Sequence, residues 1–172
     1  MGAAEFSLTA LYAALDAQRC ARGLTWAQAV REINVPFAHG PSRPIAASTI
    51  TSTRTKPRAE GDGVLQMIRW LDRTPESFIQ EFVPLEAPAF RLPPAGPGEV
   101  IRFDTRKLYA ALNTRRTTRG MTWEQVSREI RDSTVSTLTH LARGGRTGFP
   151  HVVRMTRWLE QPLATFTRVC SR

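Results

Sequence analysis

The chain contains little cysteine, histidine or lysine. Its two cysteines, Cys20 and Cys170, are far apart, and its three histidines are scattered. A zinc site needs such ligands in short-spaced pairs, so the sequence predicts no metal site. Two unpaired thiols are typical of a protein in a reducing compartment. We therefore expect no metal, no other cofactor and a cytoplasmic location.

Long apolar runs and catalytic signatures are missing as well. No stretch approaches the ~20 apolar residues of a membrane span. The N-terminus lacks the basic and apolar segments of a secretory signal. The sequence has no nucleophile elbow, no phosphate-binding glycine loop, no HExxH motif and no carboxylate pair in an apolar setting. We expect no membrane partner, no catalytic residues and no enzymatic activity.

Acidic residues are absent from two windows that are rich in arginine. No Asp or Glu occurs between Glu32 and Glu60, or between Asp132 and Glu160. The net charge of +9 lies in the second half of the chain: residues 1–86 hold nine Arg or Lys and nine Asp or Glu, whereas the rest hold fifteen and six. A solvated surface normally mixes both signs, so the windows favour a polyanionic partner.

What is present above all is an internal duplication. The sequence Leu-Tyr-Ala-Ala-Leu at 11–15 returns at 108–112, a shift of 97 residues (108 − 11). Farther on, residues 67–71 match 155–159 with a shift of 88 (155 − 67), because the first copy carries a longer connection in its middle. The period is too long for a solenoid repeat, so it indicates two copies of one domain.

Each copy has apolar residues at helical spacing and recognisable helix caps. In the second copy the pattern predicts five helices, at about 104–119, 123–130, 133–143, 150–159 and 162–166. The first copy follows the same plan, with a proline-broken connection between its second and third helices.

We therefore expect an all-α fold of two tandem five-helix domains. The first would span residues 5–86, with an inserted loop near 34–46. The second would span residues 102–172. The intervening residues 87–101 are rich in proline and glycine, which favours an extended linker of about 3.1 Å per residue.

Two segments of the second copy carry a known pattern. They are Arg-Gly-Met-Thr-Trp-Glu-Gln-Val-Ser-Arg-Glu-Ile at 119–130 and Ser-Thr-Leu-Thr-His-Leu-Ala-Arg-Gly at 136–144. This pattern resembles the Cro/cI, or lambda-repressor-like, family of helix-turn-helix domains, also called the xenobiotic-response-element type. The resemblance covers roughly 104–166 and, more loosely, 11–78. The second copy departs from the family in its turn, 131–135, which is one residue longer and lacks glycine.

The resemblance implies a five-helix domain in each copy, with the third helix entering the major groove of DNA. Its outward side chains would face the bases or the phosphates. In the second copy these are Ser133, Thr134, Ser136, Thr137 and His140. In the first copy they are Ser48, Thr49 and Ser52. At the start of the second copy's second helix, Thr122 and Gln125 would lie near phosphates.

Basic residues flank both third helices. An arginine that binds guanine through two hydrogen bonds contributes about 1–3 kcal/mol of discrimination, whereas the same side chain on a phosphate only positions the protein. We expect one of these roles for Arg143, Arg146, Arg54, Lys56 and Arg58. Arg43 begins a segment with three alternatives: a disordered loop, a basic arm along the DNA backbone or minor groove, or, at 44–47, a backward extension of the third helix.

The sequence thus predicts a sequence-specific binder of double-stranded DNA, most simply a repressor-like transcriptional regulator of a bacterium or phage. The two third helices differ, so the site would be asymmetric or in two parts. A homodimer is compatible with this hypothesis but not required. The alternatives are an antitoxin-like or adaptor protein with one degenerate DNA-binding domain and a protein partner, or an architectural DNA-binding factor of a phage or plasmid.

Overall fold

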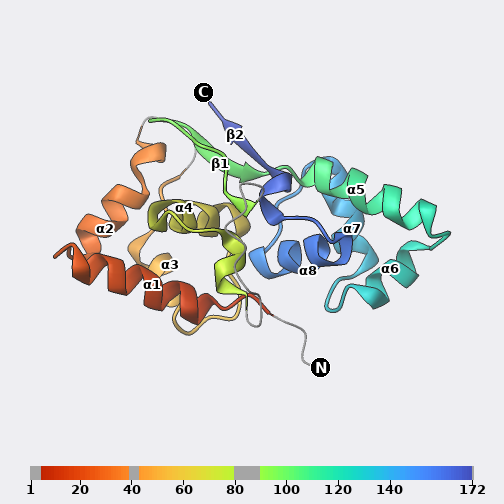
Figure 1. Cartoon of the computed structure of the whole chain (residues 1–172), viewed down its shortest axis with the longest axis horizontal. Coiled ribbons are helices and arrows are strands. Elements are labelled where there is room, and N and C mark those ends of the chain that lie inside the picture. Colours follow the sequence, from red (N-terminus) through yellow and green to blue (C-terminus); the bar gives the residue numbers. More distant parts are fainter. Residues whose placement is uncertain (1–4, 39–42, 80–89, 172) are drawn as a thin grey trace.

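A computed structural model describes residues 5–38, 43–79 and 90–171. The described residues contain eight α-helices, short 3₁₀ helices and one two-stranded antiparallel sheet (Figure 1). The α-helices are α1 (Leu8–Ala21), α2 (Trp26–Ile33), α3 (Ala47–Ser52), α4 (Gly61–Leu71), α5 (Thr105–Thr118), α6 (Trp123–Glu129), α7 (Val135–His140) and α8 (Phe149–Leu159). The 3₁₀ helices are η1 (Val35–Phe37), η2 (Pro75–Phe78), η4 (Leu141–Arg143) and η5 (Leu163–Phe166), and the strands are β1 (Val100–Phe103) and β2 (Thr167–Cys170).

The expected all-α fold of two tandem five-helix domains is wrong. The fifth helix of each copy is only the four-residue 3₁₀ helix η2 or η5. The chain then becomes extended, and β2 pairs with β1 from Val100 opposite Cys170 to Phe103 opposite Thr167. The β-branched and aromatic residues of β1 suit a strand. The end of the expected linker is therefore part of a sheet.

Helix caps confirm where the first two helices of each copy meet. Thr25 and Thr122 each form a capping box with the glutamine three residues later. Gly23 and Gly120, which precede these caps, have φ values of +64° and +61°. This left-handed conformation ends α1 and α5 at low cost only because glycine lacks a Cβ atom.

One cluster explains why certain residues recur in both copies. Glu32 on α2 accepts hydrogen bonds from Arg22 Nη1 at 2.6 Å and from Trp70 Nε1 at 2.9 Å, and Arg22 also lies over the Trp70 ring. The Arg22 guanidinium and the Trp70 N–H hold the pKa of Glu32 below its usual range. The second half repeats the cluster with Arg119, Glu129 and Trp158. The repeated residues therefore tie the end of the first helix to the second and fourth helices.

The two halves are docked on each other about a pseudo-two-fold axis. Gly61 N donates to Thr147 O at 3.2 Å, and Phe149 N donates to Ala59 O at 3.1 Å. The 88-residue shift relates Gly61 to Phe149 and Ala59 to Thr147, so the same bond is made twice. Figure 1 shows the same relation, since α1 and α5, and likewise α3 and α7, lie on opposite sides of the centre. The axis passes between Glu60 and Gly148, which pair with each other.

Aromatic rings fill the interface between the halves. Phe149 is fully buried, with its ring centroid 4.3 Å from that of Phe6 and 5.6 Å from that of Phe103. Around these rings α4 packs against α8 and η2 against η5. One hydrophobic core therefore spans both halves. Because burying apolar surface stabilises a folded protein by about 25 cal/mol per Å², this shared core holds the halves together.

The segment before β1 lies along α4. The guanidinium of Arg69 donates to the carbonyl oxygens of Ala95 at 2.7 Å and Glu99 at 2.9 Å. Gln66 Nε2 donates to Ile101 O at 2.6 Å inside the core. These bonds attach residues 95–101 to the first half, while β1 pairs with the last strand of the second half.

Candidate nucleic-acid interface

The α7 helix presents a polar face to solvent. Ser136 and His140 are exposed, and exposed Thr134 caps the helix by accepting a hydrogen bond from Thr137 N at 3.1 Å. The hydroxyls of Thr134 and Thr137 also lie 2.9 Å apart, within hydrogen-bond distance. Four of the five third-helix residues that the resemblance assigns to DNA in this copy are therefore at or near the surface.

Ser133 is a correction to that set. Its side chain is buried rather than outward, with 8% of its surface exposed, and its Oγ has no hydrogen-bond partner among the described residues. The preceding residue, Asp132, has a left-handed φ of +55°. The longer turn that sequence analysis noted is accommodated by this reversal of the backbone, and Ser133 follows it into the interior.

The α3 helix has a similar but shorter polar face. Ser48 and Thr49 are exposed. Ser52 is half-buried, and its Oγ donates to Thr49 O at 2.9 Å, which uses its proton inside the helix. The Ala46 N-cap supplies no side-chain hydrogen bond to the start of α3. Ser48 and Thr49 are thus the free hydroxyls of this face.

Exposed basic residues follow both helices, on the segments that run from each helix to the pseudo-two-fold axis. Arg54, Lys56 and Arg58 are exposed after α3, and Arg143 is exposed after α7; none of these four forms an ion pair with another described residue. Arg146 pairs with Glu60 at 2.9 Å, but its side chain is 70% exposed. An exposed ion pair contributes only about 0–1 kcal/mol, so Arg146 can readily exchange its partner.

The pseudo-two-fold axis brings these groups together. The 88-residue shift relates Ser48 to Ser136 and Arg58 to Arg146. Positions related by a two-fold axis lie at the same height along it, so α3 and α7, with their basic flanks, lie at the same height along this axis. The sequence gives no sign of this pairing of 59–61 with 147–149, because neither segment has the length or alternation of a strand.

Thr122 and Gln125 are exposed, but their acceptors are occupied. Gln125 Oε1 accepts from Thr122 N at 2.7 Å, and Thr122 Oγ1 accepts from Gln125 N at 3.3 Å. The capping box leaves the two protons of the Gln125 amide NH₂ as donors, whereas the Thr122 hydroxyl forms a hydrogen bond with the Glu124 carboxylate. Such donors suit phosphate oxygens, which is the contact that sequence analysis assigned to both residues.

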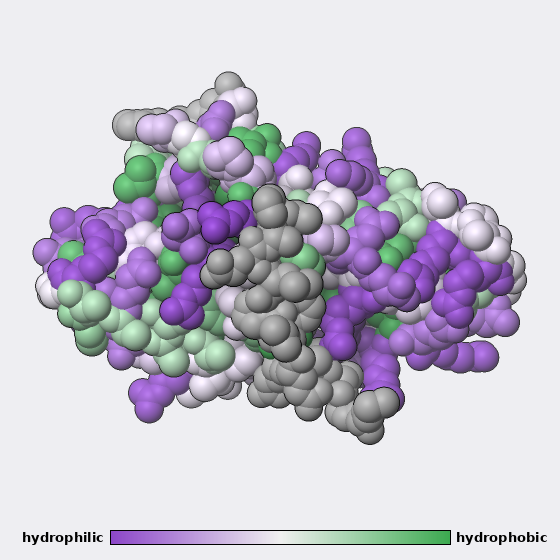
Figure 2. Space-filling view, in the orientation of Figure 1, coloured by the Kyte–Doolittle hydropathy of each residue, from purple (hydrophilic) through white to green (hydrophobic). Residues whose placement is uncertain are grey.

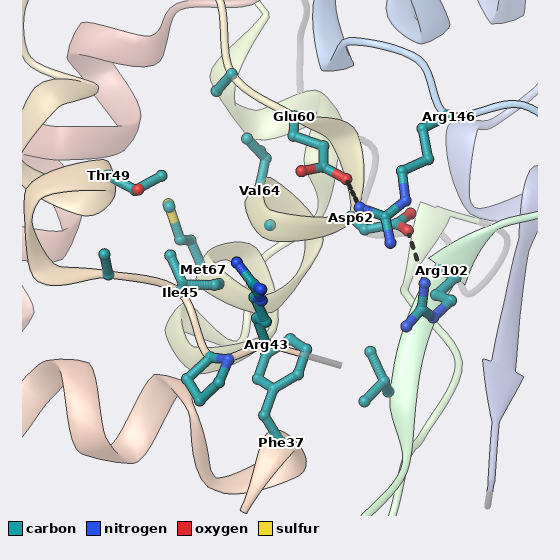
Figure 3. Close-up of a pocket in the computed structure, with 15 residues that line it drawn as sticks. Phe37, Arg43, Ile45, Thr49, Glu60, Asp62, Val64, Met67, Arg102 and Arg146 are labelled. Atoms are coloured by element: carbon teal, nitrogen blue, oxygen red, sulfur yellow. Dashed lines mark hydrogen bonds and ion pairs between the residues drawn. The ribbon is translucent and has the colours of Figure 1, made fainter. Parts of the chain in front are cut away.

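The connection between α2 and α3 is closed by one side chain. Asn34 Nδ2 donates to Ile45 O at 2.8 Å, and Ile45 N donates to Asn34 Oδ1 at 2.7 Å. Residues 39–42 of the predicted insert lie outside the described residues. Arg43 is exposed at the end of the insert, beside a cavity of about 650 Å³ that it lines with Phe37 and Met67 (Figure 3).

Two acid–base pairs border this cavity. Arg102 lies 3.5 Å from Asp62, and Glu60 receives Arg146 from the other half (Figure 3). Burial raises the pKa of Asp62, although Phe103 N donates to it and Arg102 lies beside it. The charges are largely balanced here, so the cavity does not extend the basic surface formed after α3 and α7.

The cavity has a counterpart across the axis. It has a volume of about 500 Å³ and is lined by Arg58, His151 and Arg154, among others. Burial, with the positive charges of Arg154 and Arg58, lowers the pKa of His151. The second cavity therefore holds a histidine where the first has Gly63.

Two other kinds of site are missing from the described residues. Within residues 5–38, 43–79 and 90–171, no group of three His, Cys, Asp or Glu could hold a metal ion. No helix in the described part of the chain is both long and apolar enough to cross a membrane. Comparisons with family models, with curated proteins and with solved structures found no match.

Proposed function

We propose that this chain is a sequence-specific binder of double-stranded DNA and acts as a repressor-like transcriptional regulator in the cytoplasm, beside the nucleoid. The observation that carries the proposal is the pair of exposed polar helices, α3 and α7. Both are followed by acid-poor basic segments, and the pseudo-two-fold axis relates one helix to the other. Duplex DNA has its own local two-fold axes and a uniformly negative backbone, so it complements such a surface.

In the proposed complex α3 and α7 lie in the major groove. Ser48, Thr49 and Ser136 contact base edges or phosphates, and His140 extends the surface of α7. Arg54, Lys56 and Arg143 neutralise phosphates or bind guanine. Because hydroxyls discriminate weakly between bases, the arginines supply most of the specificity.

The resemblance to Cro/cI helix-turn-helix sequences supports this proposal. The second helix of each copy packs against the third, α2 on α3 and α6 on α7, as a helix-turn-helix motif requires. The two copies differ in the connection between these helices. The first uses the loop that Asn34 closes, and the second uses the left-handed turn at Asp132. The two recognition surfaces are therefore not identical.

The two halves differ in positive charge, and we expect them to differ in their attraction to DNA. The α5 helix carries Arg106, Lys107, Arg115 and Arg116, whereas the equivalent positions of α1 hold Thr9, Ala10, Gln18 and Arg19. Figure 2 shows this contrast between a hydrophilic surface at the right and a paler one over α1 at the lower left. The second half thus supplies most of the electrostatic attraction to DNA.

The test is a gel-shift series on duplexes selected from random DNA. Replacing Arg143 and Arg146 by alanine should weaken binding more than replacing Arg54 and Arg58. Arg91→Ala removes the same charge from an exposed position before β1 and serves as the control. Equal losses for both pairs and the control reject this interface, and reversed losses reject the ranking of the halves.

A second candidate is a protein-interaction role for the first half, as in an adaptor. It is favoured by the zero net charge of residues 1–86 and by exposed Ala10, Ala13 and Ala17 on α1. In that case the Arg54 and Arg58 variants would bind DNA as well as the wild type does, while the Arg143 and Arg146 variants would not.

A further inference from the structure

We infer that the chain is a built-in dimer: one molecule fills a whole two-part DNA site whose halves have a two-fold relation and one fixed spacing. The inference rests on the proposed function and adds the stoichiometry and the geometry of the site. It follows from how the two halves are joined, which is by docking and not by a tether.

Bonds at several points hold the halves in one arrangement. The reciprocal backbone bonds of Gly61 and Phe149 lie at the axis. Farther out, Leu163 N donates to the buried Glu76 Oε1 at 2.8 Å. Arg154 reaches Glu5 at 3.2 Å. Because these contacts join both ends of the first half to the second, rotation between the halves would break several of them together.

The path from each helix to the axis limits the separation of α3 and α7. Eight residues lead from Ser52 to Glu60, and eight lead from His140 to Gly148 (60 − 52 and 148 − 140). A fully extended chain spans at most about 3.3–3.6 Å per residue, so the two helix ends, with the pair at the axis included, lie no more than about 63 Å apart. Adjacent major-groove half-sites on one face are about 34 Å apart, within this limit.

The side chains on the two helices predict how the half-sites compare. Ser48 and Thr49 match Ser136 and Thr137, so both helices begin with the same pair of hydroxyls. The C-terminal positions differ, since the shift places His140 where the first copy has Ser52. These C-terminal flanks lead toward the axis. The half-sites should therefore be alike in their outer base pairs and different near the centre.

The same geometry places arginine at the centre of the site. Arg58 and Arg146 are each two residues from the pair that lies on the axis. No second copy of the chain is needed to supply a matching half, because the second half of the chain already does so. A free chain should accordingly be monomeric, and it should bind a duplex as a monomer.

The experiment uses the full chain and the best duplex selected from random DNA, with 0, 2, 5 or 10 base pairs inserted at its centre. Sedimentation of the complex should show one chain per duplex. Each insertion should weaken binding at least ~100-fold, because a rigid pair then loses one whole half-site and each mismatched base pair alone is costly. Ten base pairs restore the face of the helix but add ~34 Å, which docked halves cannot span.

Two chains per duplex would overturn the inference. So would recovery of binding with ten inserted base pairs, because a flexible tether would allow it, or a selected site without two-fold relation. A docking variant, Gly61→Val, should tolerate the ten-base-pair insertion better than the wild type, and the wild-type arms decide if that variant does not fold. Failure to select any duplex would instead reject the proposed function itself.

Discussion

Phe103 covers Gly61 so closely that a Cβ atom at Gly61 would lie 2.7 Å from the Phe103 ring. The equivalent of Gly61 in the second half is Phe149, and the equivalent of Phe103 is Phe6. One side of the interface therefore joins an aromatic ring to a bare backbone, and the other joins two aromatic rings with centroids 4.3 Å apart. The halves fit together because each is different where they meet.

Replacing Gly61 by alanine should destabilise the protein by about 1–3 kcal/mol, the usual cost of overpacking a core. The added methyl group would meet the Phe103 ring and also Thr147 O at 2.9 Å, which is backbone and cannot rotate away. Urea denaturation would measure the loss. Gly63→Ala in the same helix is the matched control, because its methyl group would meet only Ile45 Cδ1 at 3.9 Å. The interface description fails if the control loses as much.

Glu76→Gln should change how stability depends on pH. Burial raises the pKa of Glu76, against the hydrogen bond from Leu163 N. The folded state thus holds the carboxyl proton of Glu76 more tightly than the unfolded chain does. In the unfolded chain, glutamates titrate near pH ~4.3. The stabilising contribution of Glu76 is full below that pH and is lost as pH rises through the folded pKa. The free energy of unfolding, measured in urea, should favour the variant over the wild type more at pH 8 than at pH 4. The same difference between the two proteins at both pH values would refute this.

Asn34→Ala should loosen the connection before α3 without unfolding the helices. The variant loses both hydrogen bonds to Ile45, each worth about 0.5–1.5 kcal/mol. Hydrogen exchange at the Ile45 amide would then be faster. Asn34→Asp keeps the acceptor for Ile45 N and should protect that amide better than alanine does. Equal protection in all three proteins would contradict the closing role of Asn34.

Glu60→Gln should raise affinity for DNA several-fold at low salt. The change removes a negative charge beside the axis and frees Arg146 for a phosphate. Because one more basic side chain can then contact a phosphate, the slope of log affinity against log salt concentration should steepen by about one unit. Asp16→Asn is the control, since it also removes one carboxylate and releases one arginine, Arg19, but on α1. Gel shifts at several salt concentrations would decide, and a gain no larger than that of the control would exclude Arg146 from the interface.

Sequence patterns located the helices of each copy because their signals are local. Thr25 and Thr122 cap helices through glutamines three residues away, and Gly23 and Gly120 take the one conformation that favours glycine. The outward positions of α3 and α7 were instead implied by the resemblance to helix-turn-helix domains. The buried position of Ser133 was not predicted, because the backbone reverses at Asp132 and no neighbouring residue type indicates that reversal.

The sequence by itself determined that the chain holds two copies of one helical unit, that its excess of basic residues lies in the second copy, and that basic residues flank both third helices. The tertiary structure alone decided that the copies are one docked body, that β1 at the end of the predicted linker pairs with β2 at the end of the second copy, and that the segments after the basic flanks meet at an axis. The physical reason is distance along the chain. A cap or an amphipathic face depends on residues a few positions apart, whereas Gly61 and Thr147 meet only after all the intervening elements have packed.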